Sequence, residues 1–125
     1  MLQEELSKQI IGAFYNVYNI LGYGFLEKVY ERAMCIELRK YGLQVQSQQP
    51  IQVFYEDENV GDYFADIVVN DSIIIELKAA EGLAEEHEFQ LINYLKATDI
   101  EVGLLFNFGK KPEFKRKIFT NDRKE

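Results

Sequence analysis

Three charged residues lie within an otherwise apolar stretch of the chain, where a charge calls for an explanation. Residues 61–79 read Gly-Asp-Tyr-Phe-Ala-Asp-Ile-Val-Val-Asn-Asp-Ser-Ile-Ile-Ile-Glu-Leu-Lys-Ala and contain Asp66, Glu76 and Lys78. Strands inside an α/β domain are usually near-continuous runs of Val, Ile and Leu, and a buried charge is costly unless it is paired or binds something. We therefore expect these three side chains to serve a function.

Whether the two acids meet depends on the turn between the strands that carry them. Side chains alternate along a strand, so Glu76 and Lys78 share one face and lie roughly 6.5 to 7 Å apart. A two-residue turn at positions 70 and 71 would place Asp66 opposite Ile75, away from Glu76. A three-residue loop at positions 70–72, or a bulge, would instead place Asp66 opposite Glu76, with about 5 Å between the Cα atoms. Only the second register makes a site.

In that register, Asp66 and Glu76 would offer converging carboxylate oxygens of the kind that Mg²⁺ or Mn²⁺ binds. The ammonium group of Lys78 would lie one strand-step away. The alternative is that Glu76 and Lys78 form an ion pair on a solvated face, with Asp66 an ordinary residue at the end of its strand. The spacing by itself leaves both interpretations open.

A second set of polar residues lies on predicted helices. Glu27 is in the first turn of its helix, where the helix dipole favours a carboxylate regardless of function. His87, Gln90 and Tyr94 follow each other at i, i+3 and i+7 and form one polar stripe, which could line a cleft or could be a boundary row whose tips reach solvent. His87 has no companion His or Cys at ligand spacing, so we do not expect a zinc site.

The hydrophobic pattern predicts the elements that must position these residues. Helical spacing over 2–21 and 25–41 predicts two amphipathic helices, and in the second we expect these residues to face the core: Leu26, Val29, Tyr30, Ala33 and Leu38. Alternation predicts a strand over 43–55, followed by a turn over 56–61 and the hairpin that carries the acids.

The C-terminal half adds a helix and one or two strands. Helical spacing returns over 81–97, a short buried strand follows over 102–108, and the part through Phe119 is either a strand or a short helix. The whole order indicates an α/β fold whose mixed sheet contains an antiparallel three-strand meander, is flanked by helices and gains its last strand through a helical crossover.

Composition limits the class of protein. With 125 residues, 47% of them hydrophobic, residues 1–125 should form a single domain. The net charge of −7 argues against a protein that coats duplex nucleic acid through bulk electrostatics. The single cysteine, the acidic start of the chain and the lack of a membrane-length apolar run favour a cytoplasmic protein with no membrane partner. The oligomeric state stays open, a homodimer included.

Together these residues resemble a known family. Asp66 followed by Glu76-Leu77-Lys78 behind an apolar run is similar to the D…(D/E)-x-K signature of the PD-(D/E)XK nuclease superfamily, although Ala65 replaces the Pro of that name. Gln90-Leu91-Ile92-Asn93-Tyr94 resembles the Q-x-x-x-Y motif of the RecB-like branch. Gly24-Phe25-Leu26-Glu27-Lys28-Val29-Tyr30 resembles the signature of the GxxExxY family of small bacterial proteins. The resemblance also extends through residues 61–66 and 103–109.

The resemblance implies a restriction-endonuclease-like α-β-β-β-α-β core and a Mg²⁺-dependent (or Mn²⁺-dependent) nuclease that hydrolyses phosphodiester bonds of DNA. It assigns Asp66, Glu76 and the backbone carbonyl of Leu77 as metal ligands, and Lys78 as the residue that orients the attacking water. It adds Glu27 as a further acid and gives Gln90 and Tyr94 supporting roles in the site. The alternative is a catalytically silent nuclease-fold module that binds nucleic acid or protein, because a fold does not fix an activity.

Overall fold

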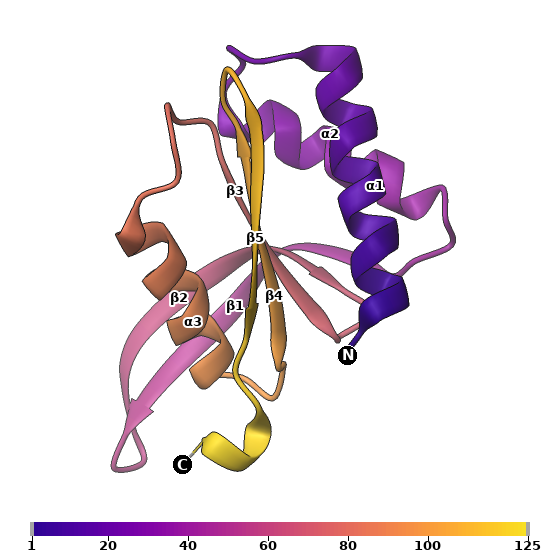
Figure 1. The fold of residues 1–125 in the computed structure, drawn as a ribbon. Helices are drawn as coiled ribbons and strands as arrows, with labels where there is room; N and C mark the ends of the chain where they lie inside the picture. Colours follow the sequence, from indigo (N-terminus) through magenta and orange to yellow (C-terminus); the bar gives the residue numbers. More distant parts are fainter. Residues whose placement is uncertain (1, 125) are drawn as a thin grey trace.

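Two N-terminal helices precede a five-stranded sheet in the computed structural model, which describes residues 2–124 (Figure 1). The elements follow the chain in this order: α1 (Glu4–Leu21), α2 (Glu27–Arg39), β1 (Val45–Tyr55), β2 (Glu58–Val69), β3 (Ile73–Lys78), α3 (Glu85–Lys96), β4 (Val102–Phe108), β5 (Pro112–Ile118) and the 3-10 helix η1 (Asn121–Arg123). The last segment, for which the pattern allowed a strand or a helix, is the strand β5.

The strands lie in the sheet in the same order as in the chain. Neighbours are antiparallel except β3 and β4, which are parallel and are joined through α3. This is the predicted meander with a helical crossover, so the predicted mixed α/β fold is confirmed. No helix within residues 2–124 is both long and apolar enough to cross a membrane.

The turn between β2 and β3 has the three-residue form. Val69 pairs with Ile73, and the Ser72 N–H donates to the Val69 carbonyl at 2.9 Å. Asn70 and Asp71 both adopt the left-handed conformation, with φ of 51° and 50°, which Asn and Asp tolerate better than most residues. The two-residue turn is therefore wrong, and the register that brings Asp66 opposite Glu76 is the one that forms.

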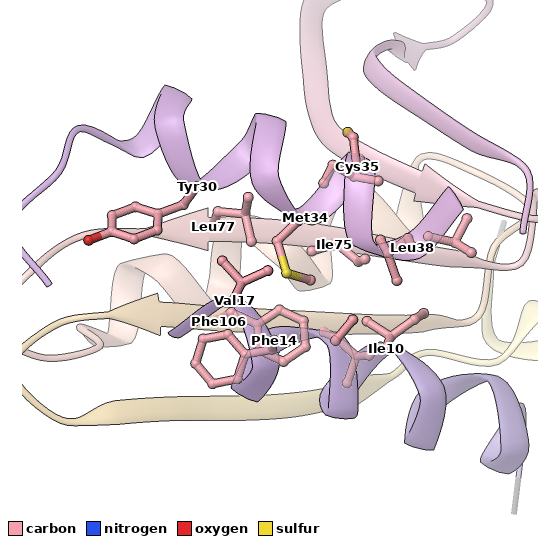
Figure 2. Packing of buried hydrophobic residues seen from close by; sticks show 14 of the residues in the cluster. Ile10, Phe14, Val17, Tyr30, Met34, Cys35, Leu38, Ile75, Leu77 and Phe106 are labelled. Atoms are coloured by element: carbon pink, nitrogen blue, oxygen red, sulfur yellow. The ribbon is translucent and has the colours of Figure 1, made fainter. Parts of the chain in front are cut away.

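The helices α1 and α2 cover one face of the sheet and bury its larger core. The rings of Phe14 and Phe106 stack with 4.5 Å between their centroids, and Figure 2 shows Met34 of α2 and Val17 of α1 in the same cluster. The buried thiol of Cys35 belongs to this cluster too, and burial raises its pKa. The core therefore contains residues from the helices and from every central strand.

Two of the expected core positions of α2 are wrong. Leu26 is 79% exposed and Val29 is 38% exposed. Leu26 precedes the helix in an extended conformation, so it does not follow the helical row that includes Tyr30 and Met34. Val29 lies about 100° around the helix from Tyr30, which takes it off the face that packs on the sheet.

The helix α3 covers the opposite face of the sheet with a smaller core (Figure 1). Its Leu91 packs so closely on Gly103 of β4 that a Cβ at Gly103 would lie 2.6 Å from a Leu91 methyl carbon. The absence of a side chain at Gly103 therefore sets how near α3 can approach the sheet.

The hairpin of β1 and β2 reaches beyond the rest of the sheet. Because β3 pairs only with residues 67–69 of β2, the outer parts of β1 and β2 pair with each other alone. We call this two-stranded part, residues 49–65, the ribbon, and it runs alongside α3 (Figure 1). The predicted turn over 56–61 is too long, since Glu58 already pairs with Tyr55 and only Glu56 and Asp57 form the turn.

Candidate active site

The sheet opens where Asp66 and Glu76 face each other. The β2–β3 ladder ends at the pair Ile67 and Ile75, one step before the two acids. In place of the next backbone hydrogen bonds, Asp66 Oδ2 accepts from the Leu77 N–H and Glu76 Oε2 accepts from the Asp66 N–H, both at 2.8 Å. The carboxylates are thus held side by side between two strands by reciprocal bonds to the opposite backbone.

The ladder on the other side of β2 is also interrupted at Asp66. Ser47 pairs with Ile67 and Gln49 with Ala65, so Gln48 stands opposite Asp66 without being paired to it. Gln48 has a left-handed backbone with φ of 52°, which takes it out of the regular ladder although the register is the same on both sides of it.

The side chain of Gln48 binds a buried acid on α2. Gln48 Nε2 donates to Glu31 Oε1 at 2.8 Å, and Lys28 Nζ lies 3.3 Å from the other Glu31 oxygen. Glu31 is only 7% exposed, and its charge adds to the rise that burial gives the pKa of Asp66. Sequence reasoning missed both Glu31 and Gln48, and the available signal for Glu31 was its i+4 spacing from Glu27 on a half-buried helix.

The surroundings of Asp66 and Glu76 disfavour the state in which both carboxyl groups are charged. Burial, and next to it the charge of Asp66, raises the pKa of Glu76 to about 8. Burial likewise raises the pKa of Asp66, against the hydrogen bond from Leu77 and the charge of Lys78, which lower it. The charge of Glu27 at the exposed start of α2 adds to both shifts. Without a bound cation, the pair retains a proton at neutral pH.

Helix α3 places two further predicted residues beside the acids. Lys78 Nζ donates to Gln90 Oε1 at 3.5 Å, so the two half-buried side chains meet across the gap between β3 and α3. Tyr94 is 6% exposed, and burial, followed by the charges of Glu76 and Asp66, raises its pKa to about 12. Its phenol therefore stays protonated and available as a hydrogen-bond donor.

Other polar residues of these segments have structural partners. His87 Nδ1 accepts from the Ala84 N–H at 3.0 Å and so caps the start of α3. Tyr30 donates its hydroxyl proton to the Gly22 carbonyl at 2.8 Å and accepts from the Phe25 N–H at 3.2 Å, which fixes the loop between α1 and α2. Tyr30 is fully buried, so of the Glu and the Tyr in the G-x-x-E-x-x-Y signature only Glu27 lies at the surface.

The end of β3 is fixed by a buried amide. Asn107 of β4 stands opposite Lys78, is fully buried, and exchanges two hydrogen bonds with the backbone of Ala80 at 2.9 and 3.0 Å. Gly109 packs so near the Ala80 carbonyl that a Cβ there would lie 2.4 Å from its oxygen. These contacts hold the backbone that follows Lys78.

The model of one protein family matches residues 4–117, nearly the whole chain; it is that of the PD-(D/E)XK nuclease superfamily. The chain belongs to this superfamily. The search of curated proteins found no match. Membership confirms the restriction-endonuclease-like class predicted for the fold, while the narrower likeness to the GxxExxY family stays a resemblance.

A solved structure supports the fold of this PD-(D/E)XK chain. The crystal structure of SSO0001 superposes with a TM-score of 0.58 at 17% sequence identity, over 97% of this chain. The chain spans 61% of the length of that protein. At this identity the likeness concerns the fold alone.

PD-(D/E)XK nucleases commonly use divalent metals, and the oxygen atoms of Asp66 and Glu76 are the ligands that such an ion would use here. Within residues 2–124, no three or more His, Cys, Asp and Glu side chains are grouped so that they could hold a metal ion. Mg²⁺, however, usually keeps several waters and binds through one or two carboxylates. Asp66 and Glu76 each use one oxygen for a backbone N–H and have a second to offer, so this pair fits such an ion.

Proposed function

We propose that this protein is a divalent-metal-dependent nuclease that hydrolyses phosphodiester bonds of DNA. The observation that carries the proposal is the reciprocal Asp66–Glu76 pair with Lys78 on the same face of β3. Two acids buried side by side repel each other when both are charged, and a bound cation would remove that repulsion. Burial, and next to it the charge of Asp66, raises the pKa of Glu76 accordingly. The superfamily membership of the chain supports a nuclease-like function.

Each residue of the site has a proposed role. Asp66, Glu76 and the backbone carbonyl of Leu77 would hold Mg²⁺ or Mn²⁺. The bound ion would supply an activated water and stabilise charge on the phosphate.

The remaining side chains would act on the water and the DNA. Lys78 would orient the attacking water and offset negative charge on the scissile phosphate, with its ammonium group directed by Gln90. Glu27, at the exposed start of α2, would add a further acid, and the protonated Tyr94 would donate a hydrogen bond to the backbone of the DNA.

Cleavage of end-labelled DNA tests this function. Single- and double-stranded DNA is incubated with the protein in Mg²⁺, Mn²⁺ or EDTA, beside D66N, E76Q and K78A. We expect cleavage that requires the ion and falls by about 100-fold or more in each variant. D62N is the matched control, because Asp62 is an exposed acid of the same strand. The proposal would be overturned if no cleavage is seen, or if cleavage survives in EDTA or in D66N, E76Q and K78A.

A catalytically silent nuclease-fold module is the second candidate. The net charge of −7 favours it, because an acidic chain does not draw a phosphate to the acid pair for cleavage, whereas a base or a protein could still bind elsewhere on the fold. A thermal-shift titration with Mg²⁺ and Mn²⁺ separates the two functions when it is set beside DNA binding at a stated salt concentration. Ion-dependent stabilisation that D66N abolishes, accompanied by cleavage, supports the nuclease, and DNA binding without either supports the module.

A further inference from the structure

A groove of about 860 Å³ runs between the ribbon and α3. Its walls are side chains of β1 and β2 on one side and of the exposed face of α3 on the other. Volumes of this order are typical of sites that bind small organic groups. The size alone does not indicate the occupant, but the position and the lining residues do.

The groove shares two lining residues with the candidate active site. Gln90 and Tyr94 both line it, and both also belong to the site, Gln90 through Lys78 and Tyr94 through its proximity to the charges of Glu76 and Asp66. A strand whose phosphodiester reached the acid pair would therefore have its neighbouring nucleotides at the mouth of the groove.

Aromatic side chains stand half-exposed in the walls. Phe54 is 56% exposed, Tyr63 48% and Phe89 55%, and they come from β1, β2 and α3 respectively. Tyr63 is held in place because its ring lies 5.8 Å from that of Tyr94 and because Gly61 leaves room for it. Rings exposed in this way can stack on the flat face of a ligand, which every nucleobase offers.

The charges of the groove fit a neutral ligand. Its lining contains one acid, Glu86, and one base, Lys96, so it offers no positive field for a phosphate backbone. The amides of Gln52 and Asn93 supply donors and acceptors for the polar edges of a flat ring. Aromatic faces with amide groups and little net charge are suited to bases, whereas the phosphates would stay outside.

We propose that this groove binds unpaired bases of single-stranded DNA next to the phosphodiester that is cut. The proposal rests on the proposed nuclease function, which places that phosphodiester at Asp66 and Glu76. Bases in a duplex have both faces stacked and their edges paired, so they cannot enter. The groove would thus select single strands, and the ribbon and α3 would hold the strand in place beside Asp66 and Glu76.

A base analogue tests the groove without catalysis. An oligothymidylate with one 2-aminopurine is titrated with the full chain in EDTA at low salt, roughly 50 mM. Stacking on the aromatic walls should quench its fluorescence. Each of Y63A and F89A should weaken binding about 5- to 150-fold and reduce the quenching, since one stacked base contributes about 1–3 kcal/mol. A duplex of the same sequence should compete poorly.

A matched control and the activity assay make the outcomes distinct. Tyr55 is 68% exposed on the same ribbon but does not line the groove, so Y55A should bind like the wild type. Equal affinity in Y63A, F89A and Y55A, absence of quenching, or equal competition by the duplex would overturn the groove proposal even if Mg²⁺-dependent cleavage is observed. Quenching that depends on Tyr63 and Phe89 without cleavage by the wild type would refute the proposed function and support the groove.

Discussion

The side chains of Asp66 and Glu76 accept hydrogen bonds that backbone carbonyl groups accept elsewhere in a sheet. Each accepts a hydrogen bond from the facing strand, so the ladder opens without leaving those N–H groups unpaired. On the other edge of β2, the left-handed Gln48 opens a second gap and reaches Glu31. The two acids therefore lie near both α2 and α3. Glu31 and Glu27 of α2 add to the rise that burial gives the pKa of Asp66, and the charges of the two acids add to the rise that burial gives the pKa of Tyr94 on α3.

The stability of the metal-free protein should depend on pH through Glu76. Its pKa in the folded chain is about 8, above its ordinary value of 4.5, so the folded state binds more protons than the unfolded state between these values. The free energy of unfolding should therefore fall as pH rises from about 4.5 to 8. Urea denaturation in EDTA across this range measures it.

The variant E76Q supplies the control for this pH dependence. Its amide oxygen can still accept from the Asp66 N–H, but the side chain no longer titrates. We expect a flatter pH profile and, above pH 8, a protein more stable than the wild type by roughly 1–3 kcal/mol. A wild-type profile that is flat or rises would contradict the assignment.

At the scale of elements, the site depends on where β3 ends and how closely α3 approaches the sheet. Asn107 and Gly109 hold the backbone after Lys78, and Gly103 lets Leu91 of α3 contact β4. Both the reach of Lys78 toward Gln90 and the width of the groove follow from these contacts. Substitutions far from the acids should therefore change the site.

Loss of the buried amide of Asn107 should destabilise the chain. N107A leaves the N–H and carbonyl of Ala80 without their partner, which should lower the free energy of unfolding by roughly 1–3 kcal/mol. Cleavage should fall as well, because the segment after Lys78 is no longer fixed. Urea denaturation beside N16A, in which an exposed Asn of α1 is removed, checks the first effect. Equal stability of the two variants would show that the amide does not hold β3.

Filling the space at Gly103 should also be unfavourable. G103A forces its methyl group against the buried Leu91, and overpacking of this kind costs about 1–3 kcal/mol. G12A is the matched control, because Gly12 is exposed within α1 and has no atom near its missing Cβ. That variant should be more stable than the wild type by about 0.5–1 kcal/mol. Thermal melting of both variants compares them directly, and a neutral G103A would mean that α3 can shift outward at no cost.

At the scale of the whole molecule, acidic charge and a neutral groove should make DNA binding depend weakly on salt. The chain has a net charge of −7, and the groove is lined by one base, Lys96, beside one acid, Glu86, so a strand bound there should release few counterions. We expect the logarithm of the affinity for single-stranded DNA to fall with the logarithm of salt with a slope of about −1 to −3. Fluorescence titrations at several salt concentrations measure it. A slope of about −6 or steeper would indicate that phosphate contacts, and not stacked bases, dominate binding.

We also propose that residues 1–125 act as a single domain, because both cores share the same sheet. Limited proteolysis should then leave the sheet and its helices together, with cutting confined to the exposed ribbon turn at Glu56 and Asp57. Release of a stable fragment that lacks α1 and α2 would contradict this. Sedimentation of the same sample measures whether the chain is a monomer or a homodimer.

Much of the fold follows from the sequence because it is encoded in contacts between near neighbours along the chain. Helical spacing predicted α1, α2 and α3, and alternation of apolar residues predicted β1. Two apolar runs joined by a polar turn predicted the hairpin of β2 and β3, and the alternation of side chains along a strand placed Glu76 and Lys78 on one face of β3. The likeness to the nuclease superfamily was also visible in the residues at positions 66, 76 and 78. Such patterns could not show the exposure of Leu26, which precedes α2 in an extended conformation, or of Val29, which depends on how α2 is rotated against the sheet.

Only the tertiary structure decided whether the acids meet. The sequence allowed two turns after Val69, and the one with left-handed Asn70 and Asp71 brings Asp66 to Glu76. The left-handed backbone at Gln48, its bond to Glu31 across 17 positions and the groove between the ribbon and α3 arise from contacts between segments far apart in the chain. Periodicity reflects local geometry, whereas these features depend on how whole elements pack, which no local pattern records.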